Sequence, residues 1–292
     1  MEKKFLLNLK VINENSLEFE TLLDGETFYG NFSNNQRNGF GIKINENGYV
    51  FIGNWRNGKI HGEGFETWPN GDIYVGFFQN NLKDGNGTYF NINGEKVSGE
   101  WIEGEMNGHG EETSSKHKFT GKFKNNEKHG QGEYSHVDGY KYTGEWSGNK
   151  KNGFGIEMWS SGDSFEGSFL NDERHGYGKY LHSDGCTYEG SFLANLKSGF
   201  GIFKDTNERR YEGDWLSNKK NGKGTLYDEK INHKIEATWF EGKINGPVTE
   251  RYSDGAQFNG YYLDSKKHGQ GIFIYANSII EVQNWKHGNL IQ

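Results

Sequence analysis

Histidine is the residue type in this chain whose spacing most invites a chemical interpretation. His61, His129, His175 and His268 each precede a glycine at the same point of a repeating pattern, and Asn, Asp or Ser takes that position elsewhere. Equivalent positions of neighbouring strand hairpins lie roughly 10 Å apart, which is too far for one metal ion bound at about 2 Å. We therefore interpret these histidines as turn residues.

Two further motifs could carry chemistry. Gly-x-Gly pairs resemble phosphate-binding loops, but they recur in nearly every repeat, lack a Walker lysine and lead into no helix. The single cysteine, Cys186, has no ligand partner at metal-binding spacing, and Ser, His and Asp do not fall on a strand–turn–helix elbow. We expect no catalytic residue, no cofactor and no metal, and hence no enzyme activity.

Basic residues form a row with a period of 23 residues. Five successive members are Lys128, Lys151, Arg174, Lys197 and Lys220, and three earlier or later repeats have Arg37, Lys83 and Lys267. The row could dock acidic filament tails or anionic headgroups along one edge. Alternatively, lysine near tight turns keeps sheet edges soluble and unpaired, the interpretation we favour because acidic residues offset the field. Trp68 and Trp159 are further candidates for a partner surface, although packing against their own repeat explains them equally well.

A repeat of 22 to 24 residues positions all of these groups. Its reference position is a glycine in ten repeats and Ala237 and Gln283 in two others; the glycines are Gly30, Gly53, Gly76, Gly99, Gly121, Gly144, Gly167, Gly190, Gly213 and Gly260. An aromatic residue follows two positions later in every repeat: Phe32, Trp55, Phe78, Trp101, Phe123, Trp146, Phe169, Phe192, Trp215, Trp239, Tyr262 and Trp285. We predict that these rings form a structural stack.

The spacing around the reference glycine indicates a strand that is buried on one face. Tyr142, Gly144 and Trp146 share one face because side chains alternate along a strand. The intervening Thr143 and Glu145 point to the other face, which is polar in most repeats.

A second strand completes each repeat. Its two glycines, Gly153 and Gly155 in one example, would leave room on the sheet for a neighbouring ring. Pairs such as Asn47–Gly48 suit hairpin turns with positive φ. We therefore predict an all-β chain of about 11–12 hairpins in an elongated, single-layer antiparallel β-solenoid.

Composition agrees with this unusual core. Only 32% of the 292 residues are apolar, whereas there are 44 Gly, 21 Phe, 16 Tyr and 8 Trp. Rings packed on glycines therefore replace an aliphatic interior. The net charge of −7 disfavours nucleic-acid binding, and one cysteine favours a reducing compartment.

The motif Tyr-x-Gly-x-Trp followed by Asn/His-Gly-x-Gly and Asp/Asn-Gly resembles the MORN repeat. Residues 142–146 with 152–155, and residues 51–55 with 61–64, are close matches. The resemblance covers about residues 28–275. It implies a non-catalytic protein-interaction scaffold, often dimeric, in a ciliary (axonemal, for example radial-spoke) or other cytoskeletal assembly of the cytoplasm. The alternative it implies is a module that tethers a complex to phosphoinositides or anionic membranes.

Three regions depart from the pattern. Ala237 and Pro247–Val248 interrupt one repeat, where we expect a kink, bulge or partner contact, and residues 113–118 shorten another and lack the Asp/Asn-Gly turn. Residues 1–27 are expected to form an N-terminal capping hairpin in which Phe5, Leu7 and Leu9 alternate. The array then covers 28–275, and 276–292 form a C-terminal capping strand.

Overall fold

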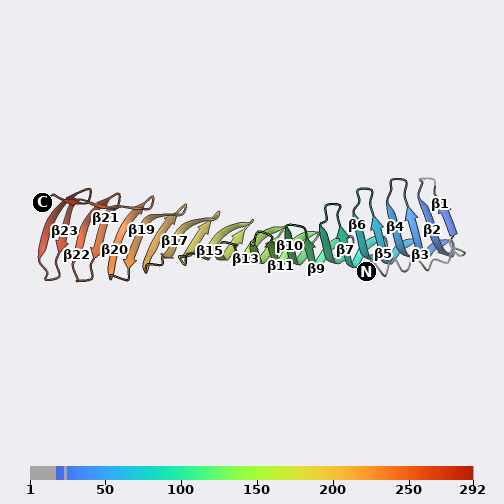
Figure 1. The fold of residues 1–292 in the computed structure, drawn as a ribbon, viewed down its shortest axis with the longest axis horizontal. Coiled ribbons are helices and arrows are strands. Elements are labelled where there is room, and N and C mark those ends of the chain that lie inside the picture. The colour runs from blue at the N-terminus through green and yellow to red at the C-terminus, as the bar shows by residue number, and fades with distance from the viewer. Residues whose placement is uncertain (1–17, 23–24, 292) are drawn as a thin grey trace. The chain divides into compact units, whose positions relative to one another are not determined.

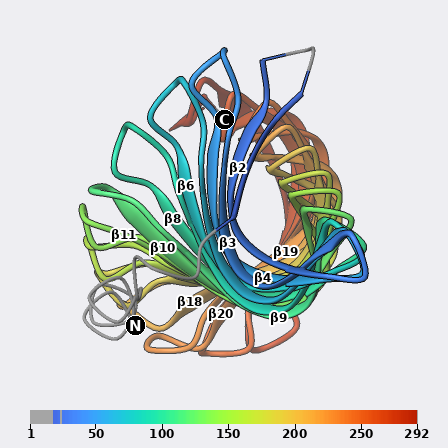
Figure 2. The same ribbon diagram turned by 90° about the vertical axis from the view of Figure 1, so that its right-hand side faces the viewer.

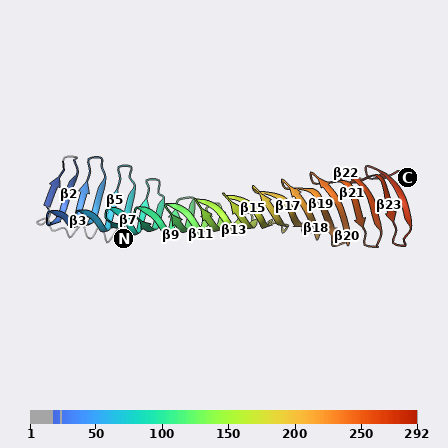
Figure 3. The same ribbon diagram turned by 180° about the vertical axis from the view of Figure 1, so that it is seen from behind.

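A computed structural model describes residues 18–22 and 25–291, which form 25 strands and no helix. The chain divides into two compact units, residues 1–137 with 147–149, and residues 138–146 with 150–292. In each unit, successive strands lie side by side in chain order and form a single layer (Figure 1 and Figure 3). Figure 2 shows that the strands of the first unit curve along their length. The described residues contain no helix that could span a membrane.

The first unit holds the strands from β1 to β11. They are β1 (Glu18–Thr21), β2 (Thr27–Ser33), β3 (Gln36–Ile44), β4 (Val50–Arg56), β5 (Lys59–Thr67), β6 (Ile73–Gln79), β7 (Leu82–Phe90), β8 (Lys96–Ile102), β9 (Glu105–Thr113), β10 (His117–Lys124) and β11 (Glu127–His136).

The second unit holds the remaining strands, apart from the last residue of β12. They are β12 (Lys141–Ser147), β13 (Lys150–Met158), β14 (Ser164–Leu170), β15 (Glu173–Leu181), β16 (Thr187–Leu193), β17 (Leu196–Lys204), β18 (Arg209–Leu216), β19 (Lys219–Asp228), β20 (His233–Phe240), β21 (Lys243–Arg251), β22 (Gln257–Leu263), β23 (Lys266–Ile274), β24 (Ile280–Lys286) and β25 (Asn289–Leu290). The single-layer antiparallel hairpin fold is therefore confirmed.

A bulge recurs inside the hairpins. Between the pairs Gly167–Gly178 and Phe169–Arg174, β14 has one residue and β15 has three. Gly176 lies in the bulge with a φ of +77°, a conformation that glycine adopts without strain. The first glycine of each Gly-x-Gly pair thus allows the backbone conformation of the bulge. The prediction that both glycines make room for a ring is therefore wrong for the first glycine.

Two kinds of turn connect the strands. The longer turns between hairpins contain the Asn/Asp-Gly pairs, and Gly48 and Gly185 have φ of +89° and +94° as these pairs predict. Inside each hairpin a two-residue turn has positive φ at both positions, for example +51° at Asn171 and +74° at Asp172. This geometry matches the twist of the flanking strands. Asn recurs at these two positions, which is a sequence signal for a turn that the predicted hairpin did not include.

The repeat around Ala237 keeps the regular register. Ala237 pairs with Val248, and the register shift falls between Ala237 and Trp239, as at the corresponding point of other hairpins. Ile235 occupies the position at which most repeats have a buried ring. Because isoleucine is smaller than the ring, Ala237 and Val248, which replace the paired glycines of other repeats, occupy the space that remains. The expected kink is therefore absent from the strand pairing.

Pro247 is tolerated in this central strand for a backbone reason. In the corresponding positions of two other repeats, the N–H groups of Phe154 and Lys223 donate to the side chains of Glu145 and Asp214 at 3.0 and 3.1 Å. A proline at this point therefore removes a donor that bonds a side chain in those repeats.

The ends of the array carry extra strands. β1 pairs with β2 from Glu18–Gly30 to Thr21–Thr27, and β24 pairs with β23 and β25. Phe5, Leu7 and Leu9 of the expected capping hairpin lie outside the described residues.

Candidate functional site

One face of the sheet in each unit, here called the ring face, carries the aromatic residues. Tyr142 is fully buried, and its ring centroid lies 5.2 Å from those of Trp146 and Phe169 in edge-to-face geometry. The first contact is within its repeat and the second is with the next repeat. The same double contact is made by Phe28, Phe51, Tyr74, Phe165, Tyr188, Tyr211 and Phe258. Each such contact contributes about 0.5–1.5 kcal/mol beyond area burial.

The buried rings lie directly on paired glycines. A Cβ added to Gly155 would lie 2.4 Å from Tyr142 Oη, and one added to Gly144 would lie 2.6 Å from the same atom. The hydroxyl donates a hydrogen bond to the carbonyl oxygen of Glu145 at 2.9 Å. Glycine at these two positions is therefore a steric requirement of the ring.

The row of basic residues belongs to the ring face, not to an exposed edge. Lys197 Nζ lies 4.8 Å from the ring centre of Tyr188 and 5.5 Å from that of Trp215. Lys220 Nζ lies 4.6 Å from Tyr211 and 4.7 Å from Trp239. Burial lowers the pKa of both lysines. Both residues are half-buried, and their ammonium groups lie against the rings.

Other members of the row add a carboxylate to the rings. Lys151 forms an ion pair with Glu157 and donates a hydrogen bond to Tyr140 Oη at 2.9 Å. Its Nζ lies 5.3 Å from the Phe169 ring centre. Glu157 is only 4% exposed, so Lys151 neutralises a buried charge.

The remaining candidate residues also make contacts inside their own units. Arg174 lies over the rings of Trp159 and Tyr180, at 5.6 and 5.4 Å. Trp159 itself stacks on Tyr180 with a centroid distance of 5.7 Å. Trp68 receives the ammonium of Lys83 at 4.6 Å. Both tryptophans thus pack on the ring face.

Apolar residues replace the cation in three repeats. Ile60, Met106 and Ile244 occupy the position of the basic row and are 6%, 1% and 4% exposed. Met106 also takes the space of a missing ring, because a Cβ added to Gly110 would meet its Cε at 2.1 Å. The apolar residue type at this position in three repeats is the sequence signal that the whole row points inward, and the prediction of an exposed edge did not use it.

A polar clamp joins successive repeats at their two-residue turns. Asn195 donates its backbone N–H to the Arg174 carbonyl at 3.0 Å and accepts the Arg174 N–H on Oδ1 at 2.9 Å. Asn81 and Asp172 make the same pair of bonds with Ile60 and Lys151. Asn therefore recurs at these turns for two reasons: it tolerates positive φ, and its side chain accepts a hydrogen bond from the preceding repeat.

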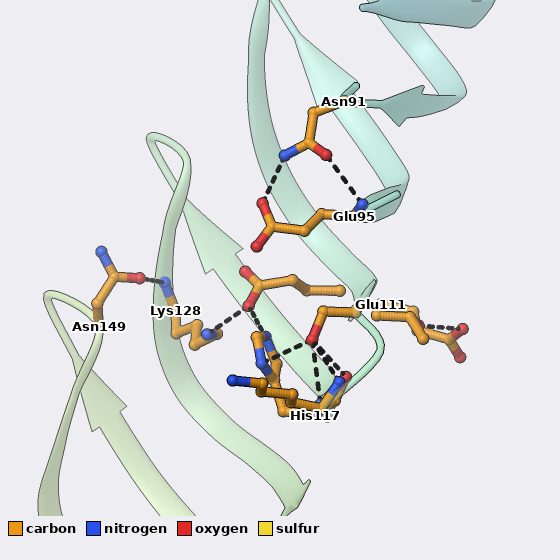
Figure 4. A network of polar contacts seen from close by, with 10 residues as sticks. Asn91, Glu95, Glu111, His117, Lys128 and Asn149 are labelled. Carbon is orange, nitrogen blue, oxygen red and sulfur yellow. Dashed lines mark hydrogen bonds and ion pairs between the residues drawn. The ribbon is translucent and has the colours of Figure 1, made fainter. Parts of the chain in front are cut away.

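The shortened repeat at 113–118 is closed by a polar network in the first unit (Figure 4). Glu112 pairs with Lys128 at 2.8 Å and with His117 at 2.9 Å, and Asn149 holds the Lys128 backbone. Burial acts to raise the pKa of Glu112, but Lys128 and His117 outweigh it and hold that pKa below its ordinary value. Ser114 Oγ accepts the His117 N–H at 3.1 Å and replaces the Asp/Asn-Gly turn.

The opposite face of the second unit exposes a row of rings. Phe154, Tyr177 and Phe200, from three consecutive hairpins, are 52%, 60% and 58% exposed. Their cross-strand partners are Ser168, Ser191 and Asp214, which leave the rings uncovered.

Among the residues that the structure describes, no group of three or more His, Cys, Asp or Glu is placed so that it could hold a metal ion. The prediction that His61, His129, His175 and His268 are turn residues is wrong, because they lie inside strands β5, β11, β15 and β23. Each precedes a bulge glycine, and it is these glycines, Gly62, Gly130, Gly176 and Gly269, that have positive φ.

The chain belongs to the MORN repeat family. The family model matches ten segments that cover more than half of the chain: 28–48, 51–73, 74–96, 98–117, 119–139, 142–164, 165–187, 188–208, 211–229 and 258–279. The hairpin of β20 and β21, which contains Ala237, falls between the last two segments. This family is a repeat module and indicates no enzyme class.

Curated proteins give no match to the chain. Among solved structures, it is similar to the TCP domain of SAS-4 from Drosophila melanogaster in complex with a proline-rich motif of Ana2, at 15% identity and a TM-score of 0.36 over 53% of this chain and 84% of that one. The wild-type TCP10 domain of Danio rerio CPAP gives 12% identity and a TM-score of 0.19 over 94% and 98%. Likenesses this low carry no argument about function.

Proposed function

We propose that this protein is a non-catalytic scaffold that holds other proteins in a ciliary (axonemal) or other cytoskeletal assembly. The exposed rings of Phe154, Tyr177 and Phe200 are the observation that supports it most. Exposed aromatic residues in a continuous row are typical of protein interfaces.

Detergent extraction of cells that express the tagged full chain tests this proposal. We expect the wild type to stay in the insoluble cytoskeletal fraction. Combined substitution Phe154→Ser, Tyr177→Ser and Phe200→Ser should release it, because the partner loses its contact surface. Tyr261→Ser, at a residue that is 57% exposed, is the matched control and should be retained. Complete release of the wild type would contradict a cytoskeletal scaffold.

Tethering to anionic membranes is the alternative function. It requires basic side chains that reach lipid, whereas Lys151, Lys197 and Lys220 make their contacts with rings of the ring face. Sedimentation with phosphoinositide liposomes separates the two functions. Binding that disappears in Lys151→Glu, Lys197→Glu and Lys220→Glu variants would favour the membrane alternative.

A further inference from the structure

Glutamate accompanies each apolar residue of the inward row. The three repeats with Ile60, Met106 and Ile244 have Glu66, Glu112 and Glu250 six residues later. In two of them a cation from another position reaches the carboxylate. Glu112 pairs with Lys128 and His117, and Glu250 pairs with Lys267 at 3.2 Å and His233 at 3.1 Å.

Glu66 is the exception among these three, since it forms no ion pair with any described residue. Its Oε1 accepts a hydrogen bond from Tyr49 Oη at 2.6 Å, whereas its Oε2 is buried without a partner. Lys83 occupies the position equivalent to Lys128 and Lys267, but its ammonium lies over Trp68 at 4.6 Å and Trp101 at 5.1 Å. Burial raises the pKa of Glu66, and the hydrogen bond from Tyr49 and the more distant charges of Lys83 and Lys43 only partly offset this.

A cavity of about 600 Å³ opens beside this carboxylate. Its wall includes the rings of Tyr49, Trp55 and Trp68, together with Asn45 and Ile60. Besides Glu66 Oε2, two more buried polar atoms of this wall, Asn45 Oδ1 and Trp55 Nε1, have no hydrogen-bond partner. Convergent unpaired polar atoms among aromatic rings are typical of a ligand site.

The two cations in the wall are already neutralised. Arg37 pairs with Glu20 at 2.8 Å and Glu26 at 2.6 Å, and Lys43 pairs with Glu26 at 2.5 Å. Glu66 is therefore the one carboxylate in this wall, and it forms no ion pair with a described residue because the ammonium of Lys83 lies over Trp68 and Trp101. Its unpartnered oxygen favours a ligand that donates hydrogen bonds.

We propose that this cavity binds the ammonium group of a lysine side chain from a partner protein. The inference rests on the proposed scaffold function, because it names the chemistry of one partner contact. The protein itself supplies the precedent: Lys151 places its ammonium beside Glu157, Tyr140 and Phe169 in the corresponding position of another repeat. In the Ile60 repeat the rings and the carboxylate are present but the lysine is not. A lysine from outside would provide it.

Titration of the full chain with n-butylammonium, a mimic of the lysine side chain, tests the proposal directly. We expect saturable shifts of the Trp55 and Trp68 indole NMR signals. In Glu66→Gln the binding should weaken at least about tenfold, because the charged acceptor is lost. Equal concentrations of NaCl and n-butanol are the controls and should not reproduce the shifts. Shifts that do not saturate, or that are unchanged in Glu66→Gln, would overturn the site.

Ile60→Lys provides a second, independent variant. Its new ammonium should pair with Glu66 from within, so the urea midpoint should be kept or rise while n-butylammonium binding is lost. Ile244→Lys is the matched control and should lower the midpoint, because Glu250 is already paired with Lys267. Full n-butylammonium binding by a folded Ile60→Lys variant would contradict the proposal. The titration uses purified protein, whereas the test of the scaffold function uses cell extraction and the variants at Phe154, Tyr177 and Phe200. A failed titration would therefore overturn the lysine site without changing the outcome of the extraction experiment.

Discussion

The repeats that contain Lys151 and Ile60 are built alike and differ in charge at one inward position. In both, a buried ring on paired glycines contacts two neighbouring rings: Tyr142 in the first and Phe51 in the second. In the first, the lysine neutralises a buried glutamate. In the second, the isoleucine leaves Glu66 without an ion pair among the described residues. The comparison teaches that the ring ladder specifies the fold, whereas the cation position varies the chemistry of each repeat.

The largest expected effect tests the shared part of the comparison. Tyr142→Ala and Phe51→Ala should each lower the free energy of unfolding by about 3–5 kcal/mol, because each leaves a cavity over paired glycines. Urea unfolding followed by tryptophan fluorescence measures the change. Phe154→Ala removes an exposed ring and should change it by no more than about 0.5 kcal/mol. Equal losses at Phe154 and Tyr142 would remove the distinction between the two faces.

The next effect tests the part that differs. Lys151→Met should cost about 3 kcal/mol, because Glu157 stays buried without its cation. Ile60→Met exchanges apolar groups of similar size and should cost less than about 1.5 kcal/mol. Adding Glu157→Leu to Lys151→Met should recover much of the loss in the same urea assay. If Lys151→Met costs no more than Ile60→Met, the ion pair contributes little to the ring face.

The sequence predicts the hairpins, the aromatic positions and the glycines well because strand alternation and turn residues are local. It also contains a signal for the basic row that spacing alone did not reveal. Lys151 lies four residues before Gly155, on the same strand face, and Ile60 and Met106 show that this position is apolar elsewhere. The charge of lysine favoured an exposed edge, but the long side chain places its ammonium over rings.

Other features depend on contacts between neighbouring strands and repeats, so the sequence of a single repeat does not predict them. The bulge at Gly176 requires the cross-strand register. The regular register at Ala237 follows from the smaller Ile235 beside it. The unpaired oxygen of Glu66 depends on where Lys83 points, which is decided by Trp68 and Trp101 of adjacent repeats.

The smallest expected effect concerns the clamps between turns, which both repeats share. Asn81→Gly and Asp172→Gly keep positive φ but remove the side-chain acceptor for the N–H of Ile60 and of Lys151. Each should cost about 0.5–1.5 kcal/mol in urea unfolding. Gly58, at the equivalent turn position, keeps only the backbone bond to Arg37. A cost near zero would show that the backbone bond alone joins the turns.

Packing of rings on glycine is the central claim, and a double-mutant cycle at Tyr142 and Gly155 tests it most directly. Alone, Gly155→Ala should lower the free energy of unfolding by about 1–3 kcal/mol, because its Cβ overlaps the tyrosine. In a Tyr142→Ile background, which imitates the repeat of Ile235 and Val248, the same alanine should raise that free energy by filling vacated space. An equal loss in both backgrounds would contradict the claim.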